Sequence, residues 1–226
     1  MENEIFGILT SIEKKLNSSS ISPRIRASLT KELEKAKNRY RNFDADLIKG
    51  ETQKQVYESL LKKGKALLKN GNNLNEVYSF LRYANAAYFD FTNSLGPLNT
   101  GIRLFTLTSA LLMALSPQFV GAVFSLVLVL PIFLGLNALK KRRAMGYTMA
   151  LFVFPVSFAV STLWLRFGYR VLKDYSGVLS ETVQATGKSP EFARLLITIP
   201  PVLSLLLLIS ACLMIYKLFK ARDMLI

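Results

Sequence analysis

Long apolar stretches without a charged residue dominate the second half of the chain. Leu104–Leu139 covers 36 such residues, and Ala144–Leu165 and Leu195–Tyr216 cover 22 each. About 20 apolar residues are enough to cross a bilayer core of roughly 30 Å. The second and third stretches therefore each predict one transmembrane helix.

The first stretch is too long for a single crossing. A helix of 36 residues would be about 54 Å long at 1.5 Å per residue. Ser116-Pro117-Gln118 offers a break, because proline disfavours helical geometry in the residue before it. We expect two helices joined by a short turn, although a re-entrant segment or one kinked, tilted helix is the alternative. The four predicted spans are about 100–116, 119–139, 144–165 and 195–216.

Polar and apolar residues alternate at helical spacing in the first part of the chain. Apolar side chains recur every three or four positions from Ile5 to Leu16, and the same period returns in three later segments ending near Phe91. Three or four such helices predict a small antiparallel bundle, with Gly96-Pro97 as the hinge. The predicted fold is thus all-α, a polytopic membrane protein with a cytosolic helical bundle (1–96) followed by a transmembrane domain (97–226).

The distribution of charge along the chain indicates which kind of partner the basic residues contact. The 226 residues include 29 Lys+Arg and 15 Asp+Glu, for a net charge of +14. Only +5 belongs to residues 1–100, and +9 lies beside or between the predicted spans. We interpret this charge as membrane orientation and contact with anionic lipid headgroups. Nucleic acid is not an expected partner, since no nucleic-acid-binding motif accompanies the charge.

Basic clusters also predict the orientation. The densest cluster lies between the second and third spans, and a second cluster follows the last span at Lys217, Lys220 and Arg222. With four spans both clusters share a side with the bundle, so the positive-inside rule places both termini in the cytoplasm. The acidic start Met1-Glu2-Asn3-Glu4 lacks the features of a signal peptide. Tyr147, Trp164 and Tyr216 lie near span ends, as interfacial aromatic residues do.

Two sets of residues are candidates for contact with partners. Aromatic residues around the fourth helical segment predict contact with a protein partner, although bundle core is the ordinary role of such residues. They are Tyr78, Phe80, Tyr83, Tyr88 and Phe91. Basic clusters predict contact with lipid headgroups, with an ordinary solvated face as the alternative for the first of them. They are Lys62, Lys63, Lys65, Lys140, Lys141, Arg142 and Arg143.

Prolines and small residues mark the predicted spans. Each internal proline removes a backbone donor and is a candidate helix kink of the kind that lines cavities in some transporters. These kinks are expected at Pro131, Pro155, Pro200 and Pro201. Small residues four apart favour close helix packing, within the chain or in a homo-oligomer. The pairs are Ala110/Ala114, Gly121/Ser125 and Ser157/Ser161.

The chemistry of the sequence favours assembly over catalysis. The chain has no His and one Cys, which removes the usual zinc ligands and the commonest general base. The spans carry no ionisable residue away from their ends, in contrast to proton relays. The loop at about 166–193 is expected to hold a short amphipathic helix, and Ser189-Pro190-Glu191 to start the next helix. We predict no catalytic residue, metal or cofactor.

Three hypotheses for function follow. The favoured one is a non-enzymatic membrane scaffold or complex subunit whose cytosolic bundle recruits a protein partner. The first alternative is a channel or translocation component of a secretion- or pilus-type assembly. The second is a membrane enzyme acting on lipid, for which the available acids are Asp174, Glu181 and Glu191, or Asp44 and Asp46.

Overall fold

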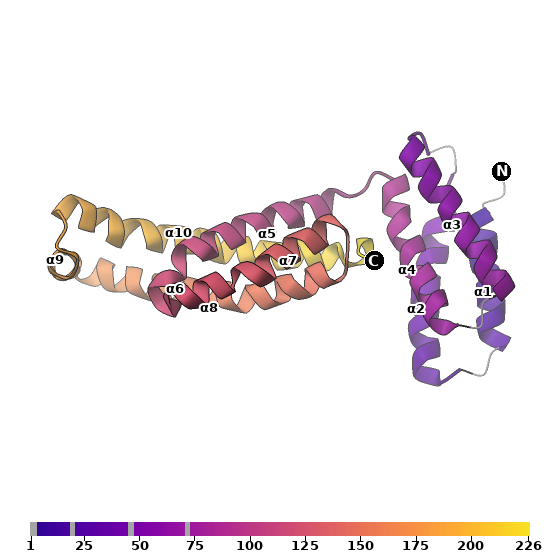
Figure 1. Ribbon diagram of the computed structural model, residues 1–226, viewed down its shortest axis with the longest axis horizontal. Coiled ribbons are helices and arrows are strands. Elements are labelled where there is room, and N and C mark those ends of the chain that lie inside the picture. Colours follow the sequence, from indigo (N-terminus) through magenta and orange to yellow (C-terminus); the bar gives the residue numbers. More distant parts are fainter. Residues whose placement is uncertain (1–3, 19–20, 45–47, 71–72) are drawn as a thin grey trace. The chain divides into compact units, whose positions relative to one another are not determined.

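The protein is all-helical in the part that the structure describes. A computed structural model covers residues 4–18, 21–44, 48–70 and 73–226, which form ten α-helices, α1–α10, and no strand (Figure 1). The chain divides into two compact units. The first runs to Gly96 and also includes the C-terminal residues Asp223–Ile226, and the second is Pro97–Arg222.

Four helices form the first unit, which we call the bundle. They are α1 (Glu4–Ser18), α2 (Pro23–Tyr40), α3 (Glu51–Asn70) and α4 (Leu74–Phe91). Both α1 and α4 pack against α2 and against α3, so the four helices enclose one core. Leu9, Leu33, Leu60 and Leu81 lie in that core with almost no exposed surface. The apolar stripes recognised in the sequence are the faces that pack together.

The second unit contains the apolar helices. Three of them are long and apolar enough to cross a membrane: α5 (Gly96–Leu115), α8 (Met145–Lys173) and α10 (Pro190–Lys220). Between them, α6 (Pro117–Val127) and α7 (Val129–Lys140) pass the same test only as a pair, bent by 61° at their junction. In this unit α8 packs alongside both α7 and α10 (Figure 1).

The backbone breaks close to where the sequence predicted a turn. α5 ends at Leu115, and Pro117 is the first residue of α6. Gly121, with φ 77° and ψ 158°, interrupts α6 in a conformation that favours glycine. A further break at Leu128 comes three residues before Pro131, whose missing N–H leaves the carbonyl of Val127 without its helical donor. By contrast, α8 continues through Pro155 and α10 through Pro200 and Pro201.

Two of the apolar helices extend well past the predicted spans. α8 has 29 residues and α10 has 31, and α9 (Tyr175–Thr186) connects their ends. Val171, Val178 and Ile197 form a small core among these three helices. The expected short helix in this loop is confirmed. The expected helix start is confirmed too, because the Ser189 side chain accepts a hydrogen bond from the N–H of Phe192.

Half of the small residues predicted to pack closely in the second unit are buried. Ser125, Ser157 and Ser161 are buried, whereas Ala110, Ala114 and Gly121 are exposed. Glycines make tight approaches as well: a methyl group added at Gly146 would lie 2.7 Å from the backbone nitrogen of Leu139. The close approach of α7 and α8 at this point therefore leaves no room for a side chain at Gly146.

The interpretation of Trp164 as an interfacial aromatic residue is wrong. The side chain is only 6% exposed, and its indole N–H donates to the carbonyl oxygen of Leu115 at 3.0 Å. The rings of Phe119 and Phe167 pack edge-on against it, with centroids at 5.0 and 5.6 Å. Its indole nitrogen therefore forms a hydrogen bond inside the protein and does not contact lipid headgroups.

Candidate functional site

A groove between α3 and α4 is the candidate site of the bundle. Its volume is about 460 Å³. Buried Leu67 and Phe80 form its apolar part, and exposed Lys63, Glu76 and Ser79 lie around it. Residues three or four apart on a helix share one face, which is why each helix contributes several side chains to one groove. The full lining is Lys63, Ala66, Leu67, Asn75, Glu76, Ser79, Phe80 and Tyr83.

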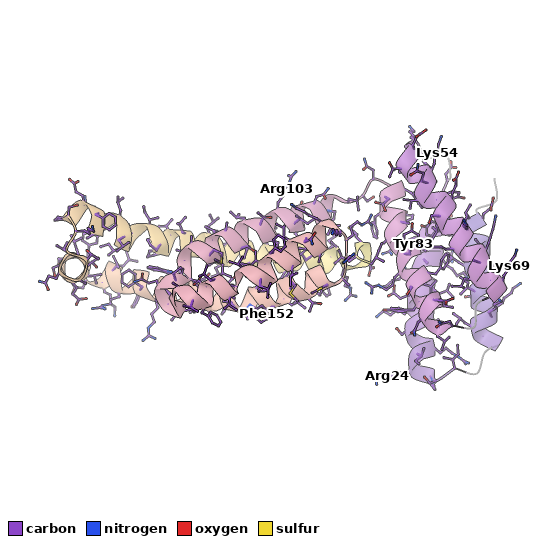
Figure 2. All side chains as sticks on the ribbon, in the orientation of Figure 1. Arg24, Lys54, Lys69, Tyr83, Arg103 and Phe152 are labelled. Carbon is purple, nitrogen blue, oxygen red and sulfur yellow. The ribbon has the colours of Figure 1, made fainter. Side chains whose placement is uncertain are left out.

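Lys63 and Tyr83 close one side of this groove as a pair. The Lys63 ammonium lies 4.4 Å from the centroid of the Tyr83 ring, within the range of a cation–π interaction. Tyr83, labelled in Figure 2, is half-buried. The structure thus brings one residue predicted to contact protein next to one predicted to contact lipid.

The five aromatic residues predicted to contact a partner divide into two groups. Phe80 and Phe91 are 5% and 2% exposed and belong to the bundle core. Phe91 packs against Phe43 and Tyr57, and Tyr88 packs edge-on against Tyr40 and Phe43. These three side chains hold the bundle together. Tyr78 and Tyr83 keep surface that is open to a partner.

Tyr78 belongs to a second hollow, between α2 and α4. This hollow has a volume of about 620 Å³ and also contains Ile25, Leu29 and Leu74. Tyr78 is 39% exposed and Ile25 46%. The bundle therefore presents apolar surface at two places along α4.

The basic residues predicted to contact lipid lie in different settings. Lys65 forms an ion pair with Glu4 at 2.9 Å, and Lys62 and Lys69 line a shallow hollow on α3. Lys140, Lys141 and Arg143 are exposed in the connection from α7 to α8. Arg142 has φ 55° there. Its N–H and that of Arg143 bond back to Leu139 and Ala138, which closes α7 in the manner of a Schellman motif.

One cluster of charged residues was missed in the sequence. Asp223 accepts hydrogen bonds from Arg39 at 2.9 Å and from Lys35 at 3.2 Å. The other terminal nitrogen of Arg39, Nη1, donates to the side-chain oxygen of Asn85 at 2.7 Å. Asn85 is 1% exposed, in the apolar stripe of α4. This buried amide was the available signal, because a buried polar group needs a partner.

Electrostatics in this cluster favour the charged forms. Burial by itself raises the pKa of Asp223, but the hydrogen bonds from Arg39 and Lys35 outweigh that effect and leave the pKa below its ordinary value. Burial likewise lowers the pKa of Lys35, yet its bonds to Glu32 and Asp223 raise it overall. Both groups therefore stay ionised across the neutral pH range.

Two of the acidic residues considered for lipid chemistry have structural roles. Asp174 caps α9 by accepting from the N–H of Gly177 at 2.9 Å, and Glu181 binds Arg170 with both carboxylate oxygens. Glu191 is exposed in the first turn of α10. Asp44 is exposed after α2, and Asp46 lies outside the described residues. Among the residues that the structure describes, no three His, Cys, Asp or Glu side chains are placed to hold a metal ion.

Comparisons with known protein families, with curated proteins and with solved structures give no match to this chain.

Proposed function

We propose that the protein is an integral membrane scaffold or complex subunit whose bundle recruits a protein partner in the α3–α4 groove. The observation that carries this proposal is the groove itself, with an apolar floor and the Lys63–Tyr83 pair on one side. Aromatic and cationic side chains around an apolar centre are typical of the residues that dominate protein interfaces.

The chemistry of the groove selects one kind of partner. Exposed lysines flank it on α3, and Lys63 faces it directly. An amphipathic helix with an acidic edge would bury its apolar face on Tyr83 and Ala66, which keep open surface in the groove, and place its carboxylates near the lysines. The expected partner is therefore an acidic amphipathic segment of another protein.

The membrane topology that we propose has four crossings, with α6 and α7 together forming the second, and with the bundle in the cytoplasm. The length and apolar character of α5, α8, α10 and the α6–α7 pair support it. The cluster Lys140–Arg143 lies on the cytoplasmic side in this arrangement, as the positive-inside rule favours, and contacts anionic headgroups.

Site-specific photo-crosslinking in native membranes tests the recruitment proposal. A photoreactive amino acid at Ser79, in the groove, is expected to give one discrete adduct. The same amino acid at Thr30, exposed on α2, is the matched control and is expected to give none. The adduct at Ser79 should also disappear when Tyr83→Ala and Lys63→Glu are combined. Equal labelling at both positions, or an adduct that survives this double substitution, overturns the proposal.

A translocation component is the second candidate function, favoured by the broken helix pair α6–α7. Discontinuous helices often form the paths of transporters, and the bend of 61° at Leu128 lies between two exposed apolar segments. Reconstituted protein that passes neither ions nor small solutes would exclude this candidate. It would leave partner recruitment untouched.

A further inference from the structure

We propose that α2 and α4 form a binding site for a short peptide in which an acidic residue precedes two apolar residues, and that Asp223–Leu225 of this chain occupies it. This site is separate from the α3–α4 groove. The contacts that carry the proposal join α2 and α4 to Asp223–Ile226, which belong to the same unit.

Two cationic side chains on one face of α2 bind the acidic residue of the peptide. Lys35 and Arg39 are four residues apart and therefore adjacent on the helix. Each carboxylate oxygen of Asp223 has its own donor, Oδ1 from Lys35 at 3.2 Å and Oδ2 from Arg39 at 2.9 Å. The side chains are partly shielded, with 20% to 26% of their surface exposed. Charge-assisted bonds of this kind are stronger than those between neutral groups.

Buried groups of the bundle hold Arg39 in position for its ligand. Asn85 accepts a hydrogen bond from Arg39 and donates to the backbone oxygen of Glu32 at 3.1 Å. The ring of Phe89 lies 4.7 Å from the guanidinium carbon of Arg39. None of these contacts involves the peptide. The acid-binding side chain is therefore fixed by the bundle itself, which lowers the entropic cost of binding.

The two residues after Asp223 contribute a backbone carbonyl and two buried apolar side chains. Arg82 donates from Nη2 to the carbonyl oxygen of Leu225 at 3.1 Å. Met224 and Leu225 are 3% and 2% exposed, whereas Ile226 is 47% exposed. The segment thus offers one side-chain charge to α2 and one backbone carbonyl to Arg82 of α4, and its two apolar side chains are buried in the structure.

Spin-label distances in the full chain test the proposal. In a Cys212→Ser background, labels at the exposed positions Lys31 and Ile226 are expected to give one narrow distance distribution. Asp223→Asn should broaden it, with the ratio of released to docked protein rising on the order of tenfold. The matched control is Glu34→Gln, an exposed carboxylate on α2, which should leave the distribution narrow.

A competing peptide tests recognition separately from folding. A synthetic peptide of residues 221–226, added at millimolar concentration, should broaden the distribution of the labelled chain. The same peptide with asparagine at the position of Asp223 should not. A broad distribution in the parent chain, or identical effects of the two peptides, overturns the proposal. So does a narrow distribution in the Asp223→Asn chain.

Discussion

Trp164 of α8 donates its indole N–H to the carbonyl oxygen of Leu115, the last residue of α5, at 3.0 Å. That carbonyl has no helical partner, because the N–H of Phe119 bonds to Ser116 instead. A carbonyl left unpaired in an apolar environment is costly. Trp164 of α8 therefore supplies the hydrogen-bond donor that the C-terminal end of α5 lacks, at the turn between α5 and α6.

Replacing Trp164 with phenylalanine is expected to destabilise the membrane unit. The ring keeps most of its packing, but the Leu115 carbonyl loses its donor, at a cost of about 1–3 kcal/mol. Thermal unfolding in mild detergent, followed by circular dichroism, measures the effect. Phe158→Leu is the control, because Phe158 lies on the same helix and is 50% exposed. Equal losses in both variants would contradict the role assigned to the hydrogen bond.

Two neighbouring hydroxyl groups on α5 are expected to respond differently to removal. Buried Thr108 donates to Ser210 of α10 at 3.1 Å. Ser109 is the one residue with a buried side-chain polar atom lacking a hydrogen-bond partner in the described part of the chain. Thr108→Val should cost about 0.5–2 kcal/mol, whereas Ser109→Ala should be neutral or stabilising. Unfolding free energies in detergent distinguish them, and a larger loss for Ser109→Ala contradicts the assignment.

Gly146 is expected to tolerate no side chain. A methyl group there would meet both the backbone nitrogen and the side chain of Leu139, at 2.7 and 2.6 Å, and the backbone cannot move aside cheaply. Gly146→Ala should destabilise the α7–α8 pair by about 1–3 kcal/mol. Gly7→Ala is the matched control, since a methyl group at Gly7 meets nothing within 4 Å and alanine favours a helix. The same sign for both substitutions would refute this packing argument.

Periodicity and apolar stretches in the sequence located most of the helices, but the predicted span 119–139 is two helices bent by 61°. The stripe through Leu29, Leu33 and Ala36 packs into the bundle core as expected. The uncharged stretches became the long apolar helices, and Pro117 marked the turn between two of them. These features are local, because helical spacing and the missing N–H of proline act within a few residues.

Contacts between distant residues were beyond the reach of these patterns. The hydrogen bond from Thr108 to Ser210 joins α5 to α10, which no spacing within either helix specifies. The bond from Trp164 to Leu115 depends on where α5 ends. In the sequence, Asp223 is an ordinary acidic residue in a basic tail. Its partner Arg39 lies 184 residues earlier in the chain, and only the fold brings the two together.

The docked state of Asp223–Leu225 is expected to depend on pH in a defined direction. Docking lowers the pKa of Asp223, since the hydrogen bonds from Arg39 and Lys35 outweigh the effect of burial. A group whose pKa is depressed stabilises the docked state fully above its ordinary pKa of 3.8 and loses that effect as the pH falls through the lowered value. The raised pKa of Lys35 gives the opposite sign, so its contribution is lost only as the pH rises beyond 10.5.

The labelled chain described above should therefore stay docked between about pH 5 and pH 9. It should release its terminal segment only as the pH falls below 3.8, the ordinary pKa of this carboxyl group. Glu32, which binds Lys35, and Arg82, which binds the carbonyl oxygen of Leu225, are charged groups of the bundle beside this contact and are the same in every variant. Asp223→Asn removes the titrating carboxylate, so its smaller docked fraction should not change over the acidic range. Release of the parent chain and the Asp223→Asn chain at the same pH would show that acid acts on the bundle and not on this contact. Release of the parent chain alone would place the transition at Asp223.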